Sequence, residues 1–306
     1  MKLSQLRNLI AVAEAGSLRQ AASALNLSQS SITKSIQQLE QSLGVELLIR
    51  TPQGIIPTAA GNALLNRAKV VEAELRQARN DVEMAQGAAV GEIKIMASPT
   101  VSVGLLPRAI VNFRRARPRV SFHIEEGVYP DVLPTLRTGE VDIALCLVPE
   151  MPSDEELEFS IVLQDNLTPA VRSEHPLTLG GRKALADLIG YDWIIYRRNR
   201  TGRDIVEHTF TDNGLEPPPN VVECTSFACT LALVESGDFI TLLPTQIFAG
   251  RQRRSSITPL FMASPMPSWN VAAITRGRHR LSPVCQAFLD EIMRTAEKTK
   301  SQSPRL

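Results

Sequence analysis

The stretch SLRQAASALNLSQSSITKSIQQLE, from Ser17 to Glu40, contains two short amphipathic patterns separated by a break. The apolar residues of the first pattern have the spacing of one helix face: Leu18, Ala21, Ala22 and Leu25. The second pattern continues with similar spacing: Ile32, Ile36, Leu39 and Leu43. The break at Asn26-Leu27-Ser28 has residue types that are typical of turns and caps. The stretch therefore predicts two helices joined by a tight turn.

Cap residues support this prediction. Ser17 and Gln20 have the capping-box spacing, and Ser28 can cap the second of the two helices. An earlier helix is expected from about Ser4 to Ala15, with Gly16 as its stop. Three short helices with inward apolar faces predict a small tri-helical core.

The helix that follows Ser28 presents a polar face to solvent. At about 100° per residue, hydroxyl, amide and ammonium groups lie opposite the apolar stripe. These groups belong to Gln29, Ser30, Ser31, Thr33, Lys34, Gln37 and Gln41. They can hydrogen-bond to base edges and phosphates, and a helix N-terminus adds backbone donors. An ordinary surface helix is polar as well, but the paired helices and the tight turn favour DNA binding.

From Ser17 to Gly61 the chain resembles the N-terminal winged helix-turn-helix of LysR-type transcriptional regulators. The matching residues are Ala21, Ala22, Leu25, Ser28, Gln29, Ile36, Leu39, Glu40, Leu43, Gly44, Leu47, Arg50, Thr58, Ala60 and Gly61. Ser30-Ser31 stands where the family usually has Pro-Ala, and Gln53 replaces a basic wing residue; both departures bear on operator preference. The DNA-binding residues that we expect are Arg19, Ser28, Gln29, Ser30, Ser31, Thr33, Lys34, Gln37, Arg50 and Gln53.

A wing is expected after the third helix. Residues 46–50 predict a strand, Pro52-Gln53-Gly54 a turn, and Ile55-Ile56 the return strand. Arg50 would then face a phosphate or the minor groove, with a salt-bridged surface arginine as the alternative. Residues 1–58 carry a net charge of only +2, from five Lys/Arg and three acids. Dimerisation is therefore expected to contribute to DNA affinity.

A long helix is predicted from residue 60 to about residue 86. Apolar residues recur at spacings of four and three, the period of a coiled-coil seam: Leu64, Ala68, Val71, Leu75, Ala78, Val82 and Ala85. The alternative is that the helix packs only on its own domain. The LysR resemblance implies a linker helix that pairs two subunits, and hence a homodimer or a homotetramer. We expect a DNA-binding domain at 1–59, this helix at 60–88 and an effector domain at 89–306.

After the small residues Gly87 to Gly91, strand and helix patterns alternate, which favours parallel α/β packing. Strands are expected at 92–97, 120–126, 141–145, 193–196, 239–244 and 269–275, and helices at 105–116, 130–138 and 283–295. GVYPDVLPTLRTGEVDIAL and LALVESGDFITLLP resemble the LysR effector domain. The resemblance implies two Rossmann-like lobes of the periplasmic-binding-protein type, lobe I at 91–161 and 267–306 and lobe II at 162–266.

Ligands of open α/β folds bind at the carboxyl ends of strands. The residues expected at such positions are Ser98, Pro99, Thr100, Val128, Arg197, Asn199, Thr225 and Phe227. Hydroxyls, an aromatic ring and basic groups suit a small organic acid, including an aromatic one. The alternatives are that Ser98 and Thr100 only cap a helix and that the arginines between 197 and 203 lie in a solvated loop.

Other functions receive less support from the sequence. The four histidines are scattered, no cysteine or histidine has metal-ligand spacing, and no phosphate-binding glycine loop or nucleophile elbow is present. We therefore expect no catalysis, metal or cofactor, against a remote alternative of a small-acid-processing enzyme. Two alternative regulators remain, namely a thiol-redox sensor that uses Cys224 and Cys229 and a regulator without effector.

The length and composition agree with this division into domains. Hydrophobic residues make up 43% of the 306 residues and the net charge is +1, as in a globular protein. We find no signal peptide and no apolar run that could span a membrane. The expected location is the cytoplasm, and the expected partners are double-stranded promoter DNA, a second copy of the chain, a small organic acid and RNA polymerase.

Overall fold

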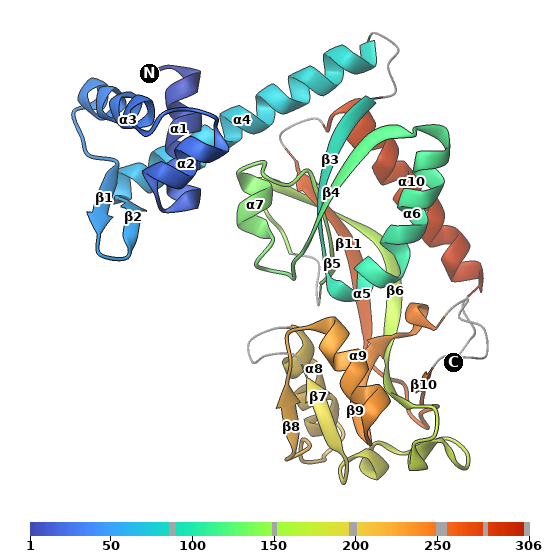
Figure 1. Cartoon of the computed structure of the whole chain (residues 1–306). Helices are drawn as coiled ribbons and strands as arrows, with labels where there is room; N and C mark the ends of the chain where they lie inside the picture. Colours follow the sequence, from blue (N-terminus) through green and yellow to red (C-terminus); the bar gives the residue numbers. More distant parts are fainter. Residues whose placement is uncertain (86–89, 149–151, 196–200, 249–255, 278–280, 303–306) are drawn as a thin grey trace. The chain divides into compact units, whose positions relative to one another are not determined.

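The computed structural model describes residues 1–85, 90–148, 152–195, 201–248, 256–277 and 281–302 (Figure 1). The chain divides into two compact units. Unit 1 comprises Met1–Val82 together with Arg137–Glu140, and unit 2 comprises Glu83–Leu136 together with Val141–Leu306.

Unit 1 is a helical domain with a two-stranded wing. Its elements are α1 (Leu3–Ala15), α2 (Leu18–Ala24), α3 (Gln29–Leu43), β1 (Leu48–Thr51), β2 (Gly54–Pro57) and α4 (Ala59–Ala85). Leu9, Ile32 and Leu39 are fully buried in one cluster formed by α1, α2, α3 and the start of α4. The predicted tri-helical core is therefore confirmed. Asn26 has a φ of +53° in the turn, and the Ser28 hydroxyl accepts the Ser31 N–H at 3.1 Å, as expected for the cap of α3.

Two local predictions in unit 1 are wrong. Ser17 precedes α2, but its side chain makes no cap hydrogen bond, and the exposed Gln20 forms no capping box with it. Leu43 was expected to face inward but is 45% exposed. It occupies the last position of α3, since Gly44 adopts a left-handed conformation and ends the helix. Leu47, which is 1% exposed, enters the core in its place.

Side-chain contacts fix the wing on the helices. The Glu40 carboxylate accepts the Leu47 N–H at 2.8 Å. The Thr58 hydroxyl donates to the Glu46 carbonyl at 2.8 Å and accepts the Gly61 N–H at 2.9 Å, so it joins the wing to the first turn of α4. A Cβ atom at Gly61 would lie only 2.0 Å from the Leu47 carbonyl oxygen. Glycine is therefore needed at this crossing.

Unit 2 alternates strands and helices along the chain. Its first half contains β3 (Val90–Ala97), α5 (Pro99–Val103), α6 (Leu105–Ala116), β4 (Arg119–Glu126), α7 (Leu133–Arg137, whose last residue is grouped with unit 1), β5 (Ile143–Val148) and β6 (Leu157–Arg172). Its second half contains β7 (Asp192–Ile195), α8 (Thr201–Thr211), β8 (Val221–Glu223), α9 (Phe227–Ser236), β9 (Phe239–Pro244), β10 (Ile257–Pro259), β11 (Ser268–Arg276) and α10 (Pro283–Gln302). Short 3-10 helices lie at Pro176–Thr178, Leu185–Leu188 and Thr245–Ile247.

The strands form one mixed sheet in the order β4-β3-β5-β11-β6-β9-β7-β8, with β10 also paired to β6. Parallel pairing holds at both ends, as predicted, but β11 and β6 run antiparallel to their neighbours in the middle. The long strand β6 pairs with β11 up to Asn166 and with β9 from Leu167 onward. One strand therefore belongs to both halves of the sheet.

Each half of the sheet has its own apolar core. Phe113 of α6 and Phe288 of α10 meet edge to face with centroids 5.1 Å apart, against β3 and β5; Figure 1 shows these two helices side by side. In the other half, Trp193 packs edge to face on Phe210 at 5.6 Å.

The buried His175 lies in the second half of the sheet, where its Nδ1 accepts the Leu177 N–H at 3.0 Å. Burial lowers the pKa of this imidazole, and the nearby Arg172 lowers it as well. The backbone and carboxylate of Asp238 act in the opposite direction, but the effect of burial is larger. Below a pH of about 6.5 the imidazole is therefore protonated to a greater extent in the unfolded chain than in the folded chain.

We predict that the free energy of unfolding decreases as the pH falls below about 6.5, with at most about 1.4 kcal/mol per pH unit from this residue. Urea unfolding followed by tryptophan fluorescence between pH 5.5 and pH 7.5 measures the slope. His175→Asn keeps an acceptor for the Leu177 N–H but does not titrate, so the slope should become shallower. An identical slope in the variant would contradict the assignment.

Candidate functional site

The predicted DNA-binding residues lie on one exposed part of unit 1. Exposed residues of α2, α3, their turn and the wing are Arg19, Ser28, Gln29, Ser30, Ser31, Lys34, Gln37, Arg50 and Gln53; Thr33 is half-buried. The Thr33 hydroxyl donates to the Gln29 carbonyl at 2.9 Å. Within the described part of the chain, Lys34 and Arg50 form no ion pair, so the alternative of a salt-bridged Arg50 finds no support there.

The predicted seam of α4 is only partly available to a partner. Ala68 is 1% exposed, and it packs with the half-buried Leu64 in the core of unit 1. The prediction of Ala68 as a dimerisation residue is therefore corrected, because the tri-helical core already covers its side chain. Val71 and Val82 are 42% and 58% exposed, and Ala78 is also exposed, whereas Leu75 is half-buried. The exposed part of the seam thus begins after the first turns of α4.

Unit 2 contains a cavity of about 140 Å³ at the ends of several strands. Five of the predicted effector residues line it: Ser98, Pro99, Thr100, Val128 and Phe227. Thr225 is exposed and does not belong to the described lining. Arg197 and Asn199 lie outside the described residues.

Sequence reasoning missed much of the cavity wall. The additional lining residues are Tyr129, Leu147, Leu167, Ile194, Ile195, Ile205, Val206, Cys224, Thr230, Thr241, Leu242, Leu243, Pro244 and Trp269. Several of them end β5, β7 and β9, so the same strand-end rule could have identified them. Their apolar side chains give no signal that distinguishes a ligand contact from a core contact.

Two hydroxyl groups of the cavity wall lack a hydrogen-bond partner among the described residues. They are the buried Oγ of Ser98, a residue that is 4% exposed, and the buried Oγ1 of Thr100. Ser98 makes no side-chain cap bond to α5, so the alternative of a plain helix cap does not hold for it. A buried hydroxyl without a partner costs about 1–3 kcal/mol. Both groups are therefore suited to bind a polar group that enters the cavity.

The thiols fall into two classes. Cys146 and Cys285 are fully buried, and burial raises the pKa of Cys146 to about 12. Cys224 lines the cavity, and its Sγ donates to the Ser226 carbonyl at 3.3 Å. Burial raises the pKa of Cys224, but hydrogen bonds with Thr230, Ser226 and Cys229 prevail and lower it.

The residues that the structure describes show neither a cluster of metal ligands nor a membrane-spanning helix. No group of three or more His, Cys, Asp or Glu side chains in this part of the chain could hold a metal ion. No helix that the structure describes is long and apolar enough to cross a bilayer.

Both parts of the chain match family models. Residues 3–62 match the bacterial regulatory helix-turn-helix protein of the lysR family, and residues 86–297 match the LysR substrate binding domain. The chain is 29% identical over 305 residues to the SDS degradation transcriptional activation protein of Pseudomonas sp., covering 96% of this chain and 97% of that protein. It is 27% identical over 308 residues to the hydrogen peroxide-inducible genes activator of Dickeya chrysanthemi, covering 99% and 100%.

A solved structure extends the similarity to a protein on DNA. Full-length CbnR complexed with its target DNA has a TM-score of 0.70 and 27% identity, over 96% of this chain and 100% of that chain. The relatives are transcriptional regulators and not enzymes. The exposed polar face of α3, the wing and the two-lobed α/β domain are thus parts of one known architecture, and the chain belongs to the LysR family of DNA-binding transcriptional regulators.

Proposed function

We propose that the chain is a cytoplasmic, homo-oligomeric promoter regulator whose DNA binding responds to a small organic acid in the cavity of unit 2. One observation carries this proposal. The buried hydroxyls of Ser98 and Thr100, without described partners, lie in a cavity of about 140 Å³ whose other described walls are mostly apolar. An apolar cavity with a few placed polar groups is the usual form of a small-molecule site.

The cavity indicates the class of ligand. A space of this size accommodates a single ring or a comparably small molecule. The described wall residues are uncharged, and Trp269 and Phe227 are among them, so we expect an apolar body that carries one polar end. Arg197 and Asn199, which follow β7, remain our candidates for binding a carboxylate. We therefore propose a small acid, including an aromatic one.

We propose that α3 reads DNA in the major groove and that the wing contacts the backbone. Gln29 is placed on the first turn of α3, where an amide can bind a base edge. Lys34 and Arg50 are exposed cations suited to phosphates. Val71 and Val82 on α4 offer apolar contacts for a second copy of the chain. Pairing of dimers would give a homotetramer, with RNA polymerase as a further partner at the promoter.

The regulation that we propose is a population shift. A ligand changes DNA binding only if it binds the alternative arrangements of the oligomer with different affinities. The same free energy of coupling must then make DNA change the affinity for the ligand.

If α3 binds DNA as proposed, two substitutions on this helix should have different effects on DNA affinity. We predict that Gln29→Ala costs about 1–3 kcal/mol on cognate DNA and little on random DNA, because it removes a base contact. Lys34→Ala should weaken both to a similar degree and reduce the salt dependence, because it removes a phosphate contact. Fluorescence anisotropy with both DNAs at several salt concentrations measures this. Lys2→Ala, at the start of α1, is the matched control for a lost exposed cation. Equal losses on both DNAs in Gln29→Ala would contradict its base-reading role.

The cavity predicts a ligand-dependent gain in stability. A bound ligand at a hundred times its Kd should stabilise the folded chain by about 2.7 kcal/mol. Thermal unfolding of the full chain against a panel of small carboxylates, sulfonates and sugar acids would identify the class. The shift should disappear in the double variant Ser98→Ala, Thr100→Val. Ser102→Ala is the control, because the Ser102 hydroxyl is also buried without a described partner but does not line the cavity. Loss of the shift in Ser102→Ala as well would count against the site.

A thiol-redox regulator is the second candidate, because Cys224 lines the cavity with a lowered pKa and interacts with the exposed Cys229. In this reading peroxide is reduced to water while the two thiols form a disulfide. Cys224→Ser would then abolish a peroxide-dependent change in DNA binding, measured by gel shift, whereas Cys285→Ser at a fully buried position would not. An unchanged response in Cys224→Ser would dismiss this candidate.

A further inference from the structure

The cavity wall continues into the segment from Val128 to Leu136, which is held by hydrogen bonds and by burial. Val128 and Tyr129 line the cavity. The Val128 carbonyl accepts the Val132 N–H at 3.2 Å, and the Val132 carbonyl accepts the Leu136 N–H at 3.2 Å and the Thr135 hydroxyl at 2.8 Å. Val132 and Leu136 are fully buried. Hydrogen bonds and burial thus connect Val128 of the cavity wall with α7.

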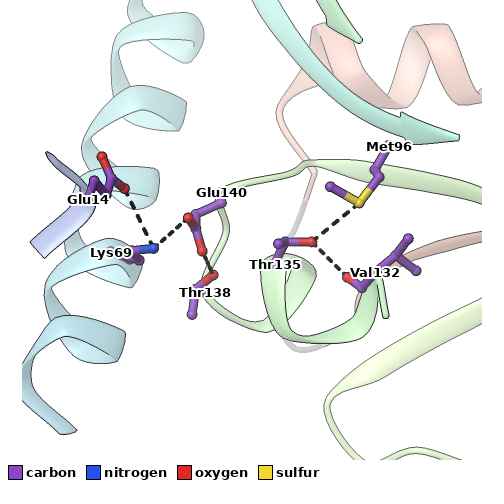
Figure 2. Close-up of polar contacts among 7 residues, drawn as sticks. All are labelled: Glu14, Lys69, Met96, Val132, Thr135, Thr138 and Glu140. Carbon is purple, nitrogen blue, oxygen red and sulfur yellow. Dashed lines mark hydrogen bonds and ion pairs between the residues drawn. The ribbon is translucent and has the colours of Figure 1, made fainter. Parts of the chain in front are cut away.

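The four residues that follow Leu136, Arg137–Glu140, are grouped with unit 1. Figure 2 shows Lys69 of α4 between two carboxylates. The Lys69 Nζ lies 2.6 Å from Glu140 Oε2 and 3.6 Å from Glu14 Oε1 on α1. The Thr138 hydroxyl donates to the other oxygen of Glu140 at 2.6 Å and orients this carboxylate.

A second contact joins the turn formed by residues 138–140 to α4. Arg76 Nη2 donates to the Gly139 carbonyl at 3.0 Å, and Gly139 adopts a φ of +73° that favours glycine. The Lys69 side chain is 22% exposed and that of Glu140 is 36% exposed, so solvent screens their interaction only in part. Lys69 thus interacts both with α1, through Glu14, and with the turn at residues 138–140, through Glu140. The helix α1 in turn packs on α3.

From this geometry we infer that Glu140 is a positioning residue for regulation. The segment from Val128 to Glu140 transmits the occupancy of the cavity to Lys69, and thereby to the helices of the DNA-binding unit. When Glu140 moves away, Lys69 pairs with Glu14 alone. The ion pair between α1 and α4 then changes, and with it the packing of α1 on α4. This inference deepens the proposed function and rests on it.

The test needs an occupant of the cavity that does not depend on knowing the ligand. Methyl methanethiosulfonate supplies one, because the thiolate of Cys224 attacks its sulfenyl sulfur. The product is a mixed disulfide that carries an S–CH3 group, methanesulfinate leaves, and the thiol proton goes to solvent. A Cys229→Ser background removes the exposed thiol, while Cys146 and Cys285 are fully buried. Mass spectrometry of the intact chain verifies a single adduct.

The readout is the ratio of Kd values for DNA with and without the adduct. Anisotropy is measured on the full chain with a DNA sequence that the wild type selects from a random pool. We expect the adduct to change Kd by about fivefold or more in the Cys229→Ser chain. With Glu140→Gln added, which keeps the shape and the hydrogen bond from Thr138, the ratio should return to nearly one. Lys69→Met should have the same effect.

Glu72→Gln is the matched control, because it removes a carboxylate from another ion pair between α1 and α4, that of Glu72 with Arg7 at 2.9 Å, but lies outside the segment from the cavity; the ratio should persist in it. An equal ratio with and without Glu140 overturns the inference, and so does a verified adduct that leaves Kd unchanged. Failure of the unlabelled wild type to select any DNA would instead contradict the proposed function.

Discussion

The antiparallel pairing of β6 with β11 is the constraint on which the effector domain depends. These two strands are separated by about a hundred residues of chain, and β6 continues past the end of this pairing into the second half of the sheet. Leu167, where β6 changes partner, and Trp269, near the start of β11, both line the cavity. The cavity thus lies where the two halves of the sheet are joined. A ligand bound there contacts both halves and can change how one is held on the other.

A different constraint organises the DNA-binding unit. The helices form a core by ordinary amphipathic packing, but the wing has only two short strands and needs other support. Glu40, Thr58 and Gly61 provide it through backbone contacts on either side of the wing. The contacts of Glu40 and Thr58 are three hydrogen bonds that involve a charged or a hydroxyl side chain. Because hydrogen bonds are directional, these contacts orient the wing as well as stabilise it.

Much of this fold could be predicted from the sequence. Periodicity identified α1, α3, α4 and α6 to within a residue or two, because one face of each is buried against a single core. It missed the strand β6 altogether, because the buried and exposed positions of β6 alternate only in places, as it serves two halves of the sheet. It also placed Leu43 inward, since the pattern carries no information about the left-handed Gly44 that ends the helix.

The candidate sites were predictable to different degrees. Exposed polar residues on α3 followed directly from the inward stripe, and the strand-end rule found Ser98, Thr100 and Val128. The same rule also covers apolar wall residues such as Leu147 and Ile194, but their side chains add no signal, because one that faces a ligand looks the same in sequence as one that faces the core. The sharing of Lys69 by Glu14 and Glu140 joins residues far apart in the chain, and no local pattern reveals it.

The contacts that hold the wing on the helices have a consequence for how such a regulator can evolve. Glu40, Thr58 and Gly61 hold the wing through backbone atoms and lie outside the proposed base-reading face. Gln29, Ser30 and Ser31 on that face are exposed, and their side chains contribute little to the core. We therefore expect substitutions on this face to change the promoter that the protein recognises with little loss of stability, while the contacts of Glu40, Thr58 and Gly61 keep the wing in place.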